Sequence, residues 1–80
     1  MNIQSIKQLV EQYTPAELHQ AERDLTEERP LAISVQGEDE GEQLTHILAA
    51  IWVCEHMQQN NADIMKAIRE YGKSVRESLS

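Results

Sequence analysis

The first apolar residues of the chain recur at helical spacing. They fall three or four residues apart with polar residues between them, as on one face of an amphipathic helix. These positions are Ile3, Ile6, Leu9, Val10 and Tyr13. The pattern predicts a first helix over residues 2–13.

A second helix is predicted from its starting sequence. In Thr14-Pro15-Ala16-Glu17, a Thr precedes a Pro at the first helical position and an acid at the third. Thr14 can accept a hydrogen bond from the Glu17 N–H, while the Glu17 carboxylate accepts one from the Thr14 N–H. Pro30 ends the helix, because a residue before proline is disfavoured in the helical region. We therefore predict a helix over residues 15–28.

The segment 31–35 has a different period. Leu31-Ala32-Ile33-Ser34-Val35 alternates larger apolar residues with small ones, which is typical of a short, half-buried strand. One strand cannot satisfy its own backbone groups. It must pair with a copy of itself, pair with another protein, or be an extended loop packed on helices. We expect a short extended or β segment here, between the second and third helices.

The third predicted helix, residues 41–59, is apolar on every face. Its main stripe is formed by Leu44, Ile47, Leu48 and Ile51, and its other faces carry Ala49, Ala50, Trp52, Val53 and Cys54. A helix that is apolar all round must be covered all round, and the remaining helices offer little cover. We therefore expect a homodimer through this helix, by way of Ile47, Ile51 and Trp52, with the 31–35 segment as a second candidate contact.

The last predicted helix, residues 62–78, carries a clean apolar stripe. Gly72 inside it costs about 1 kcal/mol relative to alanine, so we expect it to allow a close helix contact. A second stripe is cationic and is expected to bind an acidic surface or to pair with the chain's own acids, in the same monomer or across a dimer. It consists of Lys66, Arg69, Lys73 and Arg76.

Length and composition complete the predicted architecture. The chain has 80 residues, which indicates a single domain over residues 1–80. The fold class is mainly α: a small four-helix domain with one short extended or β segment. Fourteen acids against seven Lys and Arg give a net charge of −7 and argue against a nucleic-acid partner.

The sequence also predicts a location. The longest apolar run, residues 47–54, is far shorter than the roughly 20 residues that span a bilayer. The first residues do not resemble a signal peptide, and the single Cys54 allows no internal disulfide. We predict a cytoplasmic protein with no membrane partner.

Glu42 and His46 are the candidate metal ligands. They lie four residues apart on one face of the third helix. Metal sites usually need three or four converging ligands, so the others would come from Glu38, Asp39 or the His56 of a second chain. The competing interpretation is a capped helix start with a partly buried histidine that makes a hydrogen bond. No catalytic residue and no cofactor are predicted.

The acidic segment before the third helix offers candidate interaction residues. Glu38, Asp39 and Glu40 have no Lys or Arg near them in the sequence, so their carboxylates could bind a basic partner. The competing interpretation is a solvated helix start, where the helix dipole favours acids. Cys54 is expected to be a packing residue, because a reactive thiol needs exposure and a basic neighbour.

Three stretches carry a resemblance to a known family. They are Pro30-Leu31-Ala32-Ile33, the run from Gly37 to His46, and Leu48-Ala49-Ala50-Ile51-Trp52. They resemble a family of short uncharacterised acidic proteins, about 80 residues long, from Bacteroidetes-like bacteria. The resemblance covers nearly the whole chain and carries no assigned activity. It implies a complete small protein rather than a fragment of a larger enzyme.

These observations favour a small cytoplasmic protein that acts as a non-enzymatic homodimer in an interaction or accessory role. The alternative is a metal-binding protein or metal-dependent enzyme that uses Glu42 and His46. A third hypothesis is an acidic regulator that occupies a nucleic-acid-binding surface.

Overall fold

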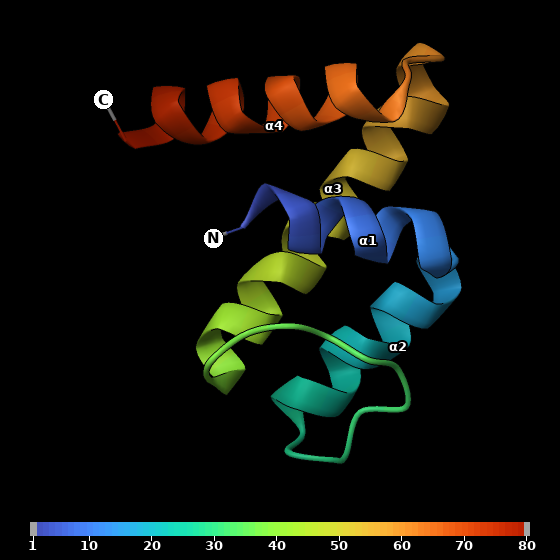
Figure 1. Ribbon diagram of the computed structural model, residues 1–80, viewed down its shortest axis with the longest axis vertical. Coiled ribbons are helices and arrows are strands. Elements are labelled where there is room, and N and C mark those ends of the chain that lie inside the picture. The colour runs from blue at the N-terminus through green and yellow to red at the C-terminus, as the bar shows by residue number, and fades with distance from the viewer. Residues whose placement is uncertain (1, 80) are drawn as a thin grey trace.

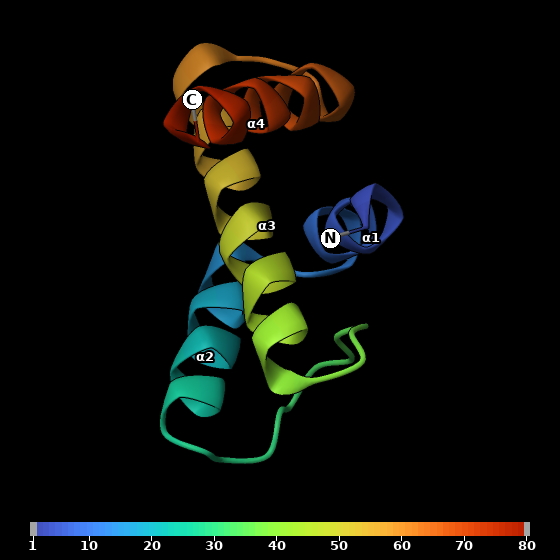
Figure 2. The same ribbon diagram turned by 90° about the vertical axis from the view of Figure 1, so that its left-hand side faces the viewer.

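Four helices make up the fold of the computed structural model, which describes residues 2–79 (Figure 1). The central helix, α3, is crossed near its C-terminal end by α4 and flanked by α1 and α2 (Figures 1 and 2). The mainly α prediction is confirmed, and every helix end lies within two residues of its predicted position. The bounds are α1 Ile3–Gln12, α2 Pro15–Thr26, α3 Glu40–Asn60 and α4 Ile64–Leu79.

Each helix begins at a side chain that accepts a hydrogen bond from a free backbone N–H. Thr14 and Glu17 form the predicted reciprocal pair at the start of α2, with bonds of 3.2 and 2.9 Å. Asp39 accepts from the Glu42 N–H at 2.8 Å, which starts α3. Asn2 and Asp63 serve α1 and α4 in the same way. Such caps contribute about 1 kcal/mol each, and they set the helix boundaries.

The end of α2 has a tight hydrogen-bonded turn. The Glu28 N–H donates to the Leu25 carbonyl at 3.2 Å, and the Arg29 N–H donates to the Asp24 carbonyl at 2.7 Å. Glu28 adopts a left-handed conformation, with φ of 58°, at a position where glycine is usual. The Arg29 side chain also pairs with the buried Asp24 carboxylate, 3.2 Å away. The turn therefore ends the helix before Pro30 is reached.

The connection between α2 and α3 corrects the predicted β segment. Residues 31–35 alternate in burial as their pattern predicts, but residues 2–79 contain no strand. Side chains from the end of α1 and from α3 take the place of a strand partner. The Tyr13 hydroxyl accepts from the Ser34 N–H at 3.2 Å, and the Gln43 amide donates to the Val35 carbonyl at 3.0 Å. The segment is thus a loop packed on helices.

Gly37 allows this loop to turn into α3. Its φ of 153° is rarely adopted by residues with a side chain. A Cβ at this position would lie 2.8 Å from Cγ of Gln43 and 2.9 Å from its backbone nitrogen. The backbone therefore comes close to α3 only because residue 37 has no side chain.

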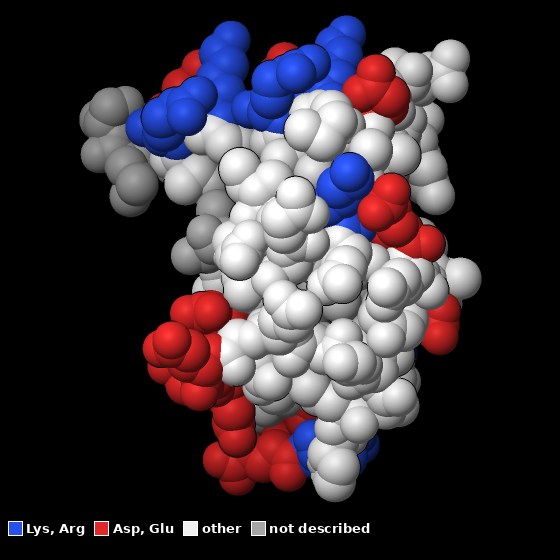
Figure 3. All heavy atoms as spheres, in the orientation of Figure 1, with Lys and Arg blue, Asp and Glu red and all other residues white. Residues whose placement is uncertain are grey.

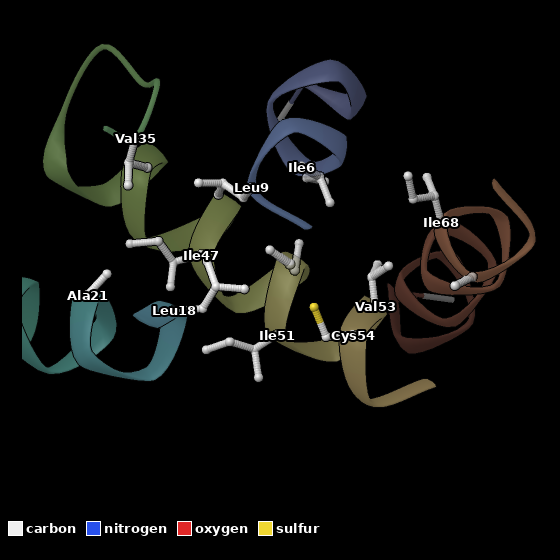
Figure 4. Close-up of a cluster of buried hydrophobic side chains, with 13 residues drawn as sticks. Ile6, Leu9, Leu18, Ala21, Val35, Ile47, Ile51, Val53, Cys54 and Ile68 are labelled. Atoms are coloured by element: carbon white, nitrogen blue, oxygen red, sulfur yellow. The ribbon is translucent and has the colours of Figure 1, made fainter. Parts of the chain in front are cut away.

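The hydrophobic core surrounds α3 on several sides. Figure 4 shows side chains from α1, α2, α4 and the connection gathered around it. Ile47 and Ile51 of α3 lie inside this core, so their burial does not require a second copy. Trp52, the third residue predicted to contact a second copy, is only half-buried. The other core residues are Ile6, Leu9, Leu18, Ala21, Val35, Ala49, Ala50, Val53, Cys54, Ala67 and Ile68.

Gly72 of α4 lies in open space, and the described helices share a limit on their length and apolar character. A Cβ at Gly72 would meet nothing within 4 Å, so the predicted close helix contact at this glycine is wrong. Among the helices of residues 2–79, none combines the length and apolar character needed to cross a membrane.

Candidate interaction surface

His46 has a structural role in the interior. Its ring is 1% exposed, and both of its nitrogens are hydrogen bonded. Nε2 accepts from the Asn2 backbone N–H at 3.1 Å, so Nδ1 carries the proton and donates to the Gln36 carbonyl at 2.8 Å. The neutral imidazole therefore fastens the start of α1 and the end of the α2–α3 connection to α3.

The predicted metal pair is not brought into a larger cluster. Within residues 2–79, no group of three or more His, Cys, Asp or Glu side chains is arranged to hold a metal ion. A metal on His46 would have to displace one of its two hydrogen bonds. His56 lies further along α3, where it stacks on Trp52 instead. Metal binding through Glu42 and His46 thus stays a prediction without a third described ligand.

The acidic segment is exposed at the N-terminal end of α3. Asp39 caps the helix, as the competing interpretation predicts. Glu38 and Glu40 are exposed, and their carboxylates form no ion pair with another described residue. Figure 3 shows acidic atoms gathered at this end of the molecule. Glu38, Asp39, Glu40 and Glu42 are called the acidic end below.

Four cations line the outer face of α4. They are exposed on the face opposite the buried Ala67 and Ile68, and they form no ion pair with the rest of the described chain. In Figure 3 they cover the top of the molecule, far from the acidic end along its 32 Å axis. No ion pair therefore joins the two groups within the described residues of one monomer. The residues, called the basic face, are Lys66, Arg69, Lys73 and Arg76.

One side of α3 remains uncovered between these charged ends. Leu48 is 45% exposed, and Leu44 and Trp52 are half-buried. These three residues are spaced by four, so they lie on the same helix face, and we call them the α3 ridge. Figure 2 looks onto the side of α3 that the other helices leave open. The ridge is thus an apolar break in the cover of a helix whose other apolar residues are buried or packed on the core.

Aromatic contacts join the ridge to α4. The Trp52 ring stacks on His56, with centroids 4.8 Å apart and planes 10° apart. Tyr71 of α4 meets the same indole edge-on, at 5.4 Å and 63°. Beyond Tyr71, α4 continues outward past α3, toward the viewer of Figure 2, and leaves Val75 half-buried. The ridge and the overhanging half of α4 therefore form one angled surface.

Two remaining features do not add chemistry to this surface. Burial, and then the neighbouring Glu55 carboxylate, raise the pKa of the Cys54 thiol, which keeps it neutral and unreactive. A pocket of about 140 Å³ lies between α2 and the connection. In its lining, Oδ1 of the buried Asp24 carboxylate accepts hydrogen bonds from the side chains of Gln20 and Arg29, which gives Asp24 a structural role.

Comparison with known proteins identifies the family. The model of a family described as "Family of unknown function (DUF6952)" matches residues 1–80. The chain belongs to the DUF6952 family. This confirms the predicted membership of a family without an assigned activity, while the bacterial source stays a prediction. A search of curated proteins and a search of solved structures each found no match.

For this DUF6952 protein, sequence reasoning missed Leu48 as a surface residue. The pattern placed Ile47, Ile51 and Trp52 at an interface, whereas Leu48 and Trp52 are the ones that reach the surface. A signal was present, because the exposed Thr45 and Glu55 share the helix face of Leu48. Polar residues beside an apolar stripe mark its solvent side.

Proposed function

We propose that this protein is a small, non-enzymatic homodimer with an interaction or accessory role, and that the α3 ridge is its dimer contact. The observation that carries the proposal is Leu48, which is 45% exposed in the middle of a helix that is buried on its other faces. Burying the part of Leu48 that is still exposed is worth roughly half of the 1.5–3 kcal/mol gained by fully burying such a side chain, and a two-fold contact buries two copies of it. The ridge also joins Tyr71 through Trp52, which widens the apolar surface.

The polar residues support an interaction role over catalysis. Both ring nitrogens of His46 are hydrogen bonded to backbone groups. Asp39 caps α3, and Cys54 is a buried neutral thiol. Each of these side chains therefore has a structural task. The cytoplasmic location belongs to the same proposal, because a lone cysteine fits a reducing compartment.

Light scattering coupled to size exclusion tests the proposal. At high micromolar concentration the wild type should elute with twice the 9.2 kDa mass of one chain. Leu48→Glu should run at 9.2 kDa with unchanged helical circular dichroism. The matched control is Met65→Glu, since Met65 is 43% exposed but lies in the first turn of α4, away from the overhang.

Two results would contradict the proposal. A wild type that stays monomeric at the highest concentration removes the homodimer. An equal loss of dimer in Leu48→Glu and Met65→Glu would show that the association does not depend on the α3 ridge. A dimer lost only in Leu48→Glu supports the ridge as the contact.

A further inference from the structure

We propose that the pocket between α2 and the α2–α3 connection binds a short linear diamine, such as α,ω-diaminobutane, in its diammonium form. The pocket is separate from the α3 ridge, so the proposal goes beyond the proposed homodimer and applies to a single copy of the chain. Figure 1 shows the connection passing back across α2 on its way to α3. The residues that line the pocket are Glu17, Gln20, Ala21, Asp24, Ala32 and Ile33.

The size of the pocket limits the ligand. Its volume is about 140 Å³, well below the roughly 300–1,000 Å³ of pockets that hold drug-sized molecules. An apolar cavity of about 150 Å³ is large enough to bind benzene. The pocket therefore takes a ligand of about six non-hydrogen atoms, which is the size of diaminobutane.

The lining combines an apolar wall with carboxylates. Ala21 comes from α2, whereas Ala32 and Ile33 come from the connection. Ala21 is buried and Ile33 is half-buried. Their methyl and methylene groups can contact the carbon chain of a ligand, so apolar burial adds to charge pairing.

The two carboxylates are spaced for a ligand with two charges. Glu17 and Asp24 are the first and last residues that α2 contributes to the lining. They lie on one face of the helix, with their Cα atoms about 10 Å apart along its axis. Carboxylates two turns apart do not converge on a single metal ion, which needs several ligands around it. They suit a ligand whose two positive charges are themselves separated, as in a linear diammonium ion.

Each carboxylate uses one oxygen for the fold. Oδ1 of Asp24 accepts from Gln20 at 3.0 Å and from Arg29 at 3.2 Å. Oε1 of Glu17 accepts from the Thr14 N–H at 2.9 Å. Among the described residues, none donates a hydrogen bond to the second oxygen of either carboxylate.

The second oxygen of Asp24 is open to a ligand although the residue is only 7% exposed. No fully buried side-chain oxygen in the described part of the chain lacks a hydrogen-bond partner. Oδ2 of Asp24 has no such partner, so it must be reached from outside, and the pocket is the opening that Asp24 lines. An ammonium group here would pair with a largely desolvated carboxylate, where charge pairing is stronger than at the surface.

The surroundings also favour a cation. Residues 15–29 carry five acids and two arginines, and neither arginine lines the pocket. Arg29 is bonded to Oδ1 of Asp24, and Arg23 donates to the amide oxygen of Gln20 at 3.0 Å. Gln20 in turn donates to Asp24. The carboxylate is therefore held in place before a ligand arrives, which lowers the cost of binding.

A nuclear magnetic resonance titration of the isotope-labelled protein with α,ω-diaminobutane tests the proposal. The Kd should be about 1 mM for so small a ligand, and the amides that shift should include those of Ala21, Asp24 and Ile33. Butylamine has the same chain with one charge, so it should bind about two- to fivefold more weakly, as expected for the loss of one exposed ion pair. The uncharged α,ω-butanediol should give no saturable shift.

Two substitutions each remove one charge from the pocket. Glu17→Gln keeps the reciprocal cap with Thr14, because glutamine serves in this position as glutamate does. It should weaken diaminobutane binding about two- to fivefold and leave butylamine binding unchanged. Asp24→Asn keeps an acceptor for Gln20 and should weaken both ligands at least fivefold. The matched control is Glu22→Gln, which makes the same charge change on a different face of α2 and should leave both Kd values unchanged.

Three outcomes would overturn the proposal. They are an absence of saturable shifts, shifts that map to the acidic end in place of the pocket, and equal weakening in Glu17→Gln and Glu22→Gln. The last would show a response to net charge alone. Urea midpoints will show which variants fold, and if Asp24→Asn does not, the comparison of Glu17→Gln with Glu22→Gln decides. The homodimer is tested separately by Leu48→Glu, so either proposal can fail without the other.

Discussion

Replacement of His46 by leucine tests how much the two hydrogen bonds of this side chain contribute to the stability of the fold. Leucine fills a similar space but can neither donate nor accept a hydrogen bond. The substitution therefore leaves the Gln36 carbonyl and the Asn2 N–H without the partners they have at 2.8 and 3.1 Å. The ends of two segments, α1 and the α2–α3 connection, lose their common attachment to α3.

The expected loss of unfolding free energy follows from the two backbone groups that lose their hydrogen-bond partner. Each unpaired buried polar group costs about 1–3 kcal/mol, which gives a gross loss of about 2–6 kcal/mol. Asn2 and Gln36 are exposed residues, so water can replace part of each bond, and the buried leucine adds apolar contact. We therefore expect a net loss near 2 kcal/mol, from a total of about 4–12 kcal/mol for a domain of this size.

Urea unfolding, followed by far-ultraviolet circular dichroism in the presence of a chelator, measures this loss. The thermal midpoint should fall by roughly 10–15 °C. His19→Leu is the control, because its ring is half exposed and its charged neighbour, Glu55, is 4.0 Å away; it should change stability by less than about 0.5 kcal/mol. A loss below about 1 kcal/mol in His46→Leu would refute the reasoning. A wild-type midpoint raised by Zn²⁺, and not raised in His46→Leu, would instead favour the Glu42 and His46 metal hypothesis.

Four further predictions concern the backbone and the thiol. Gly37→Ala should cost about 2–3 kcal/mol in urea unfolding, because its φ of 153° and the approach to Gln43 both exclude a side chain. Glu28→Gly should raise stability by up to about 1 kcal/mol, since glycine adopts a φ of 58° without strain. Gly72→Ala should raise the thermal midpoint, because a methyl group meets nothing there and alanine favours the helix by about 1 kcal/mol. The raised pKa of Cys54 means that the unfolded chain releases the thiol proton first. Stability should therefore decline as pH rises above the ordinary thiol pKa of about 8.5, and less so in Cys54→Ala; urea midpoints compared across that range would show it.

The helices were predictable because their signals are local. Thr14 and Glu17 form a capping pair within one turn of chain, and the turn at Glu28 bonds back to Leu25 and Asp24, so no distant contact is needed to place α2. The segment 31–35 differs, because its alternation suits both a strand and a loop laid on helices. Only Tyr13 and Gln43, which supply its hydrogen bonds from elsewhere in the chain, decide between the two.

The candidate surface was less predictable, for a physical reason. Apolar residues all round α3 give no dominant face, so the polar neighbours Thr45 and Glu55 are a weak signal for the side that the other helices leave open. Leu48 and Ile47 are neighbours of similar character, yet one is exposed and the other is in the core. His46 likewise depends on Asn2, 44 residues away in the chain, and on Gln36, 10 residues away.

The central place of α3 has a consequence for how the chain folds during synthesis. Ile6, Leu9 and Leu18 find their apolar partners mainly on α3, which follows them in the sequence. At about 5–20 residues per second, the 21 residues of α3 take about 1–4 s to be made. Until they emerge from the ribosome, α1 and α2 are nascent segments without a core, open to chaperones and proteases. Folding of this protein therefore waits for its third helix.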